Sequence, residues 1–205
     1  MPGEPVRDVI LASGSPRRRE LLRIIGLPHA VIPADIDEVR RSGETPKAFT
    51  QRVARDKVLS VAADHPYAAI LGADTIVEAN GQVLGKPGGV DEAAAMLRLL
   101  SGRTHTVHTA MALAVGQRCE SIVSSATVEF EELTSSQIFW YIGTGEPMDK
   151  AGAYAIQGYG SLFVKRIEGS PYTVIGLPVH DLPRLFASAG LSLWDRIRGA
   201  THIRS

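Results

Sequence analysis

The sequence predicts an α/β fold with a mixed sheet, and three observations support this class. Apolar, partly β-branched segments alternate along the chain with segments whose apolar residues recur at helical spacing. Asn80-Gly81 lies between two arms of alternating polarity, which is a strong signal for a two-residue β-hairpin and so for antiparallel pairing. Hydrophobic residues make up 44% of the 205-residue chain, which is enough for the core of one large domain or of two small lobes.

The chain is expected to begin with a strand that leads directly into a helix. Residues 6–12 form an apolar, partly β-branched run that is typical of a buried strand. Ser15 is a good N-cap and Pro16 suits the first helical position, so we expect a helix to start there. Leu21 lies on its apolar side, and Gly26 is the expected C-terminal stop.

An acidic connector, "PADIDEV", separates this helix from a long amphipathic helix expected over residues 45–66. The apolar residues that share one face of the long helix are Phe49, Val53, Ala54, Val58, Val61 and Ala62. Lys57 lies four residues from both Val53 and Val61, so it is expected at the border of that apolar stripe.

The hairpin around Asn80-Gly81 predicts its own register. The expected opposite pairs are Ala79 with Gln82, Val77 with Leu84, and Thr75 with Lys86. Asp74 is adjacent to the last pair, but in an ideal strand its side chain would point to the other sheet face. A bend, or the reach of the lysine, would be needed to bring Asp74 and Lys86 together.

The second half of the chain continues the alternation of helices and strands. Helices are expected over residues 90–102 and 134–143, the latter opened by a capping box of Thr134 and Gln137. Paired strands are expected over residues 104–115 and 124–133. The glycine-rich segment 148–179 contains two further expected strands, residues 180–190 form a closing helix, and the tail from Ser192 has no assigned role.

Composition excludes several classes of protein. Lys plus Arg and Asp plus Glu both total 22, so the chain lacks the basic surplus of a typical nucleic-acid binder. Cys119 is the only cysteine, which excludes an intramolecular disulfide and a cysteine-rich zinc site and fits a reducing cytosol. The first residues lack the layout of a signal peptide, and the apolar runs fall far short of the ~20 residues needed to span a bilayer. We therefore expect a soluble cytoplasmic protein with no nucleic-acid or membrane partner.

The stretch "LASGSPRRREL" has the chemistry of an anion site at a strand-to-helix turn. A helix N-terminus presents unpaired N–H groups and partial positive charge, and Ser13 and Ser15 add hydroxyl donors. Arg17 and Arg18 add forked, permanently charged donors that suit phosphate oxygens. These residues alone support a solvated basic helix start equally well, and that interpretation is retained for Arg19.

Asp74 follows the apolar run "AILGA", so it is expected at or within a buried strand. A buried carboxylate is costly unless it is paired, hydrogen-bonded or bound to a metal, although a purely structural carboxylate remains an alternative. Lys57, Lys86 and Lys150 would each suit an ordinary surface position, but with Arg17 and Arg18 they would form a phosphate clamp.

Other catalytic motifs are not met. "NGQVLGKP" resembles the end of a phosphate-binding loop, but position 80 is asparagine and a proline follows the lysine. Neither G-x-G-x-x-G nor G-x-S-x-G occurs, and Cys119 lacks an obvious base. His105 and His108 are three residues apart on an expected strand, so they should face opposite sides and not share a metal.

Seven segments together resemble the Maf family of nucleotide pyrophosphatases in both content and order. They are "LASGSPRRRELL", "DIDE", "GADTIV", "GKP", "LSGRTHTVHTA", "GEPMDKAGAYAIQGYG" and "VIGLP", which together extend over residues 11–178. The resemblance implies a fold related to the inosine-triphosphate pyrophosphatases (Maf/Ham1). That fold is an elongated, mixed, twisted sheet flanked by helices, with two lobes around a central cleft and residues 1–205 as one domain. It also implies hydrolysis of a nucleoside triphosphate to the monophosphate and pyrophosphate with a divalent metal, Mg²⁺ or Mn²⁺.

The resemblance also assigns roles to individual residues. It places the substrate-binding groups at Ser13, Ser15, Arg17, Arg18, Thr75 and Gln157, and the catalytic groups at Glu38, Lys57, Asp74 and Lys86. The combination of Arg17, Thr75 and Gln157 is similar to the branch that acts on dTTP and UTP, with modified pyrimidine nucleotides as further candidates. The branch acting on 7-methyl-GTP carries a tryptophan at the first of these positions. "EGSPYTVIGLP" is slightly unusual before its V-x-G-L-P core.

The resulting hypothesis is metal-assisted cleavage of a phosphoanhydride bond. Asp74 would orient or deprotonate the attacking water, Glu38 and Asp74 would hold the metal, and the basic residues would neutralise the triphosphate. The alternative from another class is a nucleotide-sensing regulatory protein of cell division or septum formation that binds without turnover. Direct DNA binding is a third hypothesis. Homodimerisation is suggested by the resemblance alone.

Overall fold

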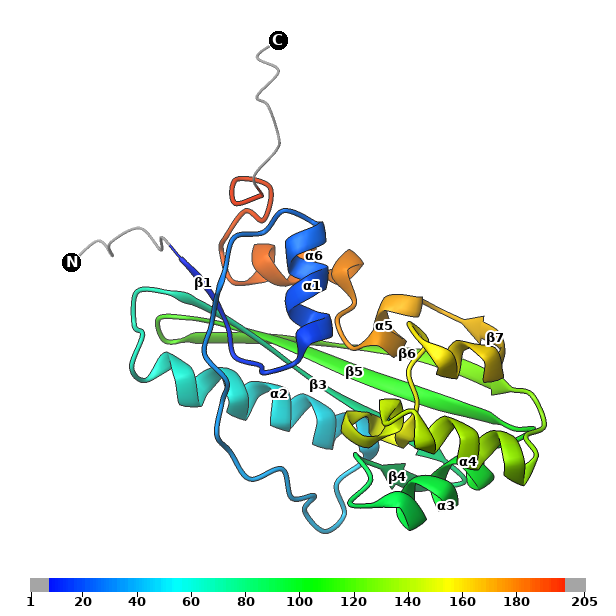
Figure 1. Ribbon diagram of the computed structural model, residues 1–205. Coiled ribbons are helices and arrows are strands. Elements are labelled where there is room, and N and C mark those ends of the chain that lie inside the picture. Colours follow the sequence, from blue (N-terminus) through cyan, green and yellow to red (C-terminus); the bar gives the residue numbers. More distant parts are fainter. Residues whose placement is uncertain (1–7, 198–205) are drawn as a thin grey trace.

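The computed structural model describes residues 8–197, and these form a mixed sheet with helices on both faces (Figure 1). The strands are β1 (Val9–Leu11), β2 (Ala30–Val31), β3 (Ala69–Ala79), β4 (Gln82–Leu84), β5 (Thr104–Val115), β6 (Arg118–Phe130) and β7 (Val164–Glu168). Their order is β2-β1-β3-β5-β6-β7, with β4 paired to β3. β1 is parallel to β2 and β3, whereas the other pairs are antiparallel, so the predicted mixed α/β class is confirmed.

One face of the sheet is covered by a single long helix, whereas the other, the split face, is covered by two separate groups of helices. They are α1 (Pro16–Ile24), α2 (Pro46–Ala62), α3 (Val90–Leu100), α4 (Ser135–Gly143), α5 (Pro171–Ile175) and α6 (Leu182–Ser188), with 3₁₀ turns η1 (Glu146–Asp149), η2 (Ala151–Ala153), η3 (Tyr159–Phe163) and η4 (Val179–Asp181). α2 packs on one face, whereas α1 and α6, and separately α3 and α4, pack on the other, and Figure 1 shows these two pairs of helices at opposite ends of the sheet. Within residues 8–197, no helix is both long and apolar enough to cross a bilayer.

The split face carries two separate apolar clusters that meet at a polar pair. Ala69, Leu71 and Ala73 of β3 pack toward α1 and α6, whereas Val77 and Ala79 pack toward α3 and α4. Between them lies Thr75, which is opposite Thr109 of β5 and hydrogen-bonded to it through the two hydroxyls at 3.0 Å. Each cluster, with the helices packed on it, is one lobe, so the two lobes share long strands, and the change from one core to the other occurs at the middle of β3.

Several predicted elements are confirmed. The first helix starts at Pro16 after Ser15, the hairpin pairs Ala79 with Gln82 and Val77 with Leu84, and the capping box of Thr134 and Gln137 is present. The expected helix over residues 45–66 is observed as α2, with its N-cap at Thr45. The closing helix is the shorter α6.

Other expectations are corrected by the structure. β6 begins at Arg118, six residues before the predicted start of that strand, because it pairs with β5 down to the turn. The pairing of Thr75 with Lys86 is wrong, since β4 ends at Leu84 and Thr75 has its strand partner in β5. The first two residues of the strand expected over residues 6–12 lie outside the described part, and the strand observed is Val9–Leu11.

The second strand expected within residues 148–179 is also wrong, because "PYTVI" is helical. Pro171 occupies the first turn of α5, where its missing N–H costs nothing, and Gly176 ends the helix with φ of 107°. The β-branched residues Thr173 and Val174 suggested a strand, but these end signals prevailed.

Candidate active site

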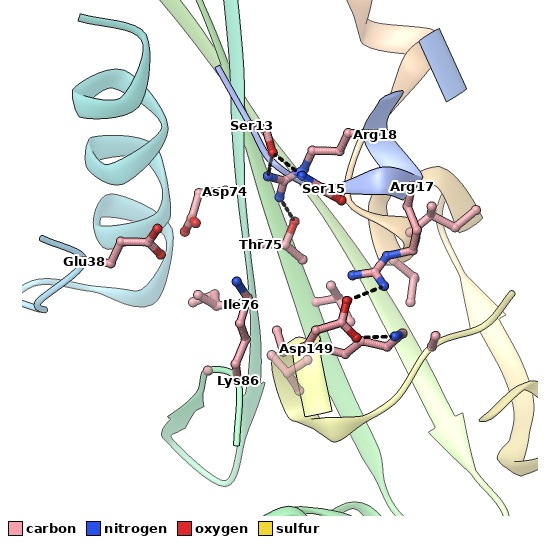
Figure 2. A pocket seen from close by; sticks show the side chains of 18 of the residues that line it. Ser13, Ser15, Arg17, Arg18, Glu38, Asp74, Thr75, Ile76, Lys86 and Asp149 are labelled. Atoms are coloured by element: carbon pink, nitrogen blue, oxygen red, sulfur yellow. Dashed lines mark hydrogen bonds and ion pairs between the residues drawn. The ribbon is translucent and has the colours of Figure 1, made fainter. Parts of the chain in front are cut away.

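A cavity of about 870 Å³ opens at the edge of β3, and it is lined by every site residue predicted from the sequence. These residues are Ser13, Ser15, Arg17, Arg18, Glu38, Lys57, Asp74, Thr75, Lys86 and Gln157. Figure 2 shows Asp74 and Glu38 on one side of the cavity and Arg17 and Asp149 on the other. Segments far apart in the sequence thus converge on one concave surface.

The cavity exists because one edge of β3 is left without a strand partner at its middle. β1 pairs with β3 only at Ala69–Leu71, and β4 pairs only at Val77–Ala79. Side chains of successive strand residues point to opposite faces, yet both Asp74 and Thr75 reach the cavity because it wraps around this open edge. Asp74 and Lys86 therefore line the same cavity, although the side chain of Asp74 was expected to point to the other sheet face in an ideal strand.

Asp74, Lys57 and Glu38 form a chain of ion pairs on the α2 side of the cavity. The Lys57 ammonium donates to Asp74 Oδ1 and to Glu38 Oε1, both at 2.8 Å. Asp74 is only 5% exposed and Lys57 9%, so the ion pair between them is shielded from bulk water, whereas the Glu38 side chain is half exposed. Lys57 lies on α2 at the border of the apolar stripe, as expected from its spacing.

Two further cationic side chains line the cavity, Lys86 from the segment after β4 and Arg17 from α1. Lys86 is exposed, and among the described residues it has neither an ion pair nor a side-chain hydrogen bond. Arg17 is 3.6 Å from Asp149, a residue whose carboxylate also accepts a bond from Lys150. Lys150 additionally donates to the Glu146 carbonyl at 2.7 Å. Lys86 and Arg17 therefore both have donors left for a ligand.

Arg18 has a different environment from Arg17, because protein acceptors surround its guanidinium. Nε donates to the Gly176 carbonyl at 2.9 Å, Nη1 to Ser13 Oγ at 3.0 Å and to the Ala73 carbonyl at 2.7 Å, and Nη2 to Thr75 Oγ1 at 3.1 Å. Burial lowers the pKa of this guanidinium. Arg18 thus donates hydrogen bonds to Ala73 and Thr75, the two β3 residues that flank Asp74.

The turn between β1 and α1 supplies hydroxyl and backbone donors. Ser13 is buried, and its Oγ accepts the Ser15 N–H at 3.2 Å. Ser15 is the N-cap of α1, but its side chain caps no N–H of the helix. The first intrahelical bond runs from the Arg19 N–H to the Ser15 carbonyl, so the Arg17 and Arg18 N–H groups face outward from the first turn, as the anion-site hypothesis requires.

Beyond the charged groups the cavity wall is mainly apolar. The larger apolar and aromatic side chains of this wall are Phe49, Ile76, Val77, Val83, Val107, Tyr154, Ile156, Val174 and Ile175. Gln157 is exposed at this wall, while Thr75 is engaged by Arg18 and Thr109. The Tyr154 hydroxyl is 2.8 Å from His105 Nε2, and burial lowers the pKa of His105 to about 4.

Glu146 is a site-building residue that the sequence reasoning missed. Its carboxylate accepts bonds from the Tyr141 hydroxyl at 2.8 Å and from the N–H groups of Tyr159 and Gly160 at 2.9 and 3.1 Å. Partial burial acts to raise the pKa of Glu146, but these hydrogen bonds lower it overall. Glu146 therefore folds the loop that carries Gln157, and its only sequence signal was its place in "GEPMDK". Glu146 itself does not line the cavity, and the lining residues that were missed include Arg40, Phe49, Asp149 and Tyr154.

The donor set at Asp74 and Glu38 suits a hard divalent cation. The two carboxylates bond the same Lys57 nitrogen, so they converge on one point of the cavity. Within residues 8–197, no group of three or more His, Cys, Asp or Glu side chains could hold a metal ion. Such a two-carboxylate site fits Mg²⁺, which commonly completes its shell with water and substrate phosphates. His105 and His108 point to opposite faces and have separate partners, Tyr154 for His105 and Glu78 and Ser125 for His108.

Comparison with known proteins gives consistent matches over most of the chain. The model of the family described as "Maf-like protein" matches residues 8–189. A protein of Myxococcus xanthus named dTTP/UTP pyrophosphatase is 49% identical over 185 residues, which cover 90% of this chain and 94% of that protein. A protein of the same name from Anaeromyxobacter dehalogenans is 47% identical over 92% of this chain and 97% of its own length.

Solved structures give a more distant likeness. The crystal structure of a nucleoside-triphosphatase (dITP/XTP pyrophosphatase) from Mycobacterium abscessus aligns with 90% of this chain and 98% of its own chain, at 14% identity and a TM-score of 0.45. The Ham1 protein of Staphylococcus aureus aligns with 60% of this chain and 72% of its own, at 15% identity and a TM-score of 0.44.

Proposed function

Since this chain belongs to the Maf-like protein family, we propose that it is a nucleoside triphosphate pyrophosphatase that hydrolyses dTTP and UTP. The products are the nucleoside monophosphate and pyrophosphate. Water adds to the α-phosphorus, the bond from that phosphorus to the α,β-bridging oxygen breaks, and pyrophosphate leaves. Modified pyrimidine triphosphates are proposed as additional substrates.

The observation that supports this reaction best is that the buried Asp74 carboxylate lies in the same cavity as the cationic side chains of Arg17 and Lys86. Lys57 engages Asp74 Oδ1, and Oδ2 makes no hydrogen bond among the described residues. We assign Oδ2 the task of orienting the attacking water and accepting its proton. The fixed ion pair with Lys57 prevents the carboxylate from rotating away, which provides the positioning on which phosphoryl transfer depends.

The triphosphate is proposed to lie between this carboxylate and the donors across the cavity. Lys86, Arg17 and the first-turn N–H groups of α1 would neutralise its charge, with Ser15 as a hydroxyl donor. The base would rest against the apolar wall, where Gln157 can hydrogen-bond to a pyrimidine edge. The structure supports Thr75 and Arg18 as groups that hold the wall of this pocket in place, because both are already hydrogen-bonded to protein groups.

A divalent cation is part of the proposal, with Glu38 and Asp74 as its protein ligands. Mg²⁺ or Mn²⁺ bound there would polarise the phosphate and offset its negative charge. Lys57 would then keep both carboxylates oriented toward the same point.

Three further expectations belong to this proposal. The one-domain organisation expected for residues 1–205 is supported by strands β3, β5 and β6, which run through both lobes. The cytoplasmic location and the homodimer stay predictions from the sequence.

The decisive experiment is a panel of normal and modified nucleoside triphosphates, with pyrophosphate detection and several divalent metals. We expect turnover of dTTP and UTP to exceed that of purine nucleotides. Saturable binding of nucleotides without pyrophosphate release would instead favour the sensor hypothesis.

Replacement of the proposed base tests the assignment at the residue level. Asp74→Asn keeps the shape of the side chain and removes its capacity to accept a proton, so kcat should fall by about 10²- to 10⁴-fold. Circular dichroism would verify that the variant is folded. A folded Asp74→Asn variant that hydrolyses dTTP at the normal rate would exclude Asp74 as the base.

A further inference from the structure

Glu38 reaches the active site on a segment that has no regular secondary structure. Residues 32–45 connect β2 to α2, and Figure 1 shows this connector passing alongside α2 before it joins the start of the helix. The ion pair of Glu38 with Lys57 is half exposed on the Glu38 side, and ion pairs that are open to water contribute little. Before Glu38, Ile36 of the connector packs against the cluster that contains Phe49 and Val53 of α2, so it is the segment after Glu38 that needs a further contact with the helix.

Arg52 of α2 makes that contact, at a point one and a half turns before Lys57. Its Nε and Nη2 donate to the two carboxylate oxygens of Glu44 at 2.7 and 3.0 Å, and Nη2 also donates to the Val39 carbonyl at 2.9 Å. The paired side chains are only 17% and 10% exposed. A two-point pair of this kind is stronger and more directional than a single contact.

The connector also folds on itself around the same carboxylate. The Arg41 N–H donates to Glu44 Oε2 at 3.0 Å, and the guanidinium of Arg40 donates to the Glu44 carbonyl. Hydrogen bonds from Arg52 lower the pKa of Glu44 to about 2, so the pair stays charged at any ordinary assay pH. The segment that follows Glu38 is thus a closed turn, and Arg52 of α2 donates both to its Val39 carbonyl and to its Glu44 carboxylate.

We propose that Arg52 is a positioning residue for the hydrolysis, and that it acts by holding Val39 and Glu44 so that Glu38 faces Asp74 across Lys57. This inference rests on the proposed function, because it assumes that Glu38 takes part in the reaction. Arg52 itself does not line the cavity, so its influence on the substrate runs through the connector. Its guanidinium also lies 5.6 Å from the ring centre of Phe49, which does line the cavity.

The first test compares Arg52→Met with Arg55→Met on the same helix. Arg55 donates to the Cys119 carbonyl of β6 at 2.7 Å and has no bond to the connector, so it is a matched control. For Arg52→Met we expect kcat for dTTP to fall on the order of 10- to 100-fold, because a small misplacement of a catalytic group is costly. The KM should change little, since Arg17 and Lys86 lie on other segments, and Arg55→Met should match the wild type in both constants.

A double-mutant cycle with Glu38→Gln distinguishes positioning from a general loss of structure. If Arg52 acts through Glu38, the loss caused by Arg52→Met should largely disappear when Glu38 is already Gln. Single-turnover measurements with enzyme in excess allow the slow variants to be compared. An equal fold-loss in both backgrounds would overturn the proposal.

The third readout does not depend on turnover. Trypsin cleaves after arginine, and Arg40 and Arg41 both lie within the connector. We expect faster cleavage at these two bonds in Arg52→Met than in Arg55→Met, and intermediate behaviour in Arg52→Lys, which keeps the charge but loses the fork. Unchanged cleavage together with unchanged kcat would refute the inference. A wild-type protein that releases no pyrophosphate from any nucleotide would refute the proposed function, and the trypsin comparison would still decide whether Arg52 holds the connector.

Discussion

At the scale of single residues, Arg17 and Arg18 are sequence neighbours with opposite surroundings. Arg17 faces the cavity and has one ion pair, at 3.6 Å, with Asp149. Arg18 donates to two carbonyls and two hydroxyls from three different segments. The sequence motif predicted both as ligands of the triphosphate, and both line the cavity, but side-chain type alone does not reveal which of two adjacent arginines is engaged by protein acceptors.

Substitution by methionine should therefore affect the two positions differently. Arg17→Met should raise the KM for dTTP about tenfold, the loss expected for one charge-assisted contact, and leave the free energy of unfolding nearly unchanged. Arg18→Met leaves the Ala73 and Gly176 carbonyls without partners, so the free energy of unfolding should drop by about 2–4 kcal/mol. Steady-state kinetics and urea unfolding measure the two effects. Equal effects of both variants on KM, with no change in stability, would contradict this division of roles.

His105 provides a second prediction at this scale, based on pH. Burial lowers its pKa from 6.5 to about 4, so the folded protein favours the neutral ring. The unfolded chain binds a proton more readily, so the stability contributed by this group is complete above pH 6.5 and is lost as the pH falls toward 4. The loss amounts to about 3 kcal/mol at most.

Urea unfolding of the wild type and of His105→Gln between pH 7 and pH 4 measures this effect. Glutamine can still hydrogen-bond to the Tyr154 hydroxyl but does not titrate in this range. The difference in unfolding free energy between the two proteins should therefore shift in favour of the variant as the pH is lowered. A pH-independent difference would show that His105 does not titrate in this way.

At the scale of elements, the accuracy of the sequence prediction depends on how local the determining signal is. The hairpin at Asn80-Gly81 and the capping box at Thr134 were predicted correctly, because a few adjacent residues determine each one. The strand–helix error at Pro171–Ile175 arose where β-branched side chains and end signals conflicted. The acidic connector that carries Glu38 was predicted, but its conformation could not be, because Arg52 holds it from a different element.

The packing of α2 on β3 gives a prediction for Gly72. A Cβ at this position would lie 2.6 Å from Val58 Cγ1 of α2, so Gly72→Ala should lower the free energy of unfolding by about 1–3 kcal/mol. Gly143→Ala at the end of α4 is the control, since its Cβ would meet nothing within 4 Å and alanine favours a helix. Thermal unfolding of both variants compares them. If Gly72→Ala were as stable as Gly143→Ala, α2 would not approach β3 as closely as described.

At the scale of the whole molecule, the site lies where two cores meet on shared strands. The sequence predicted the α/β class and ten of the residues that line the cavity, because their motifs are specific to a family. It did not predict the open edge of β3, which depends on where β1 ends and β4 begins. Strand ends of this kind are decided by packing between distant segments, which no local pattern records.

The continuity of the strands predicts that the two lobes unfold together. The chain has two tryptophans, and Trp140 lies on α4 in one lobe whereas Trp194 follows α6 in the other. Both are at least half exposed, so single-tryptophan variants made by Trp→Phe replacement should cost little stability. Fluorescence of each variant should give the same urea midpoint as circular dichroism. Two separate midpoints would mean that the lobes are independent folding units.

The shared middle of β3 also restricts how a protein of this kind can change over evolution. Asp74 and Thr75 lie at the boundary between the lobes, on a strand that contributes to both cores. Neither lobe can therefore be exchanged or inherited as a separate module without cutting through β3. New substrate preferences in such a lineage are expected to arise by substitution of residues that line the cavity, and not by recombination of lobes.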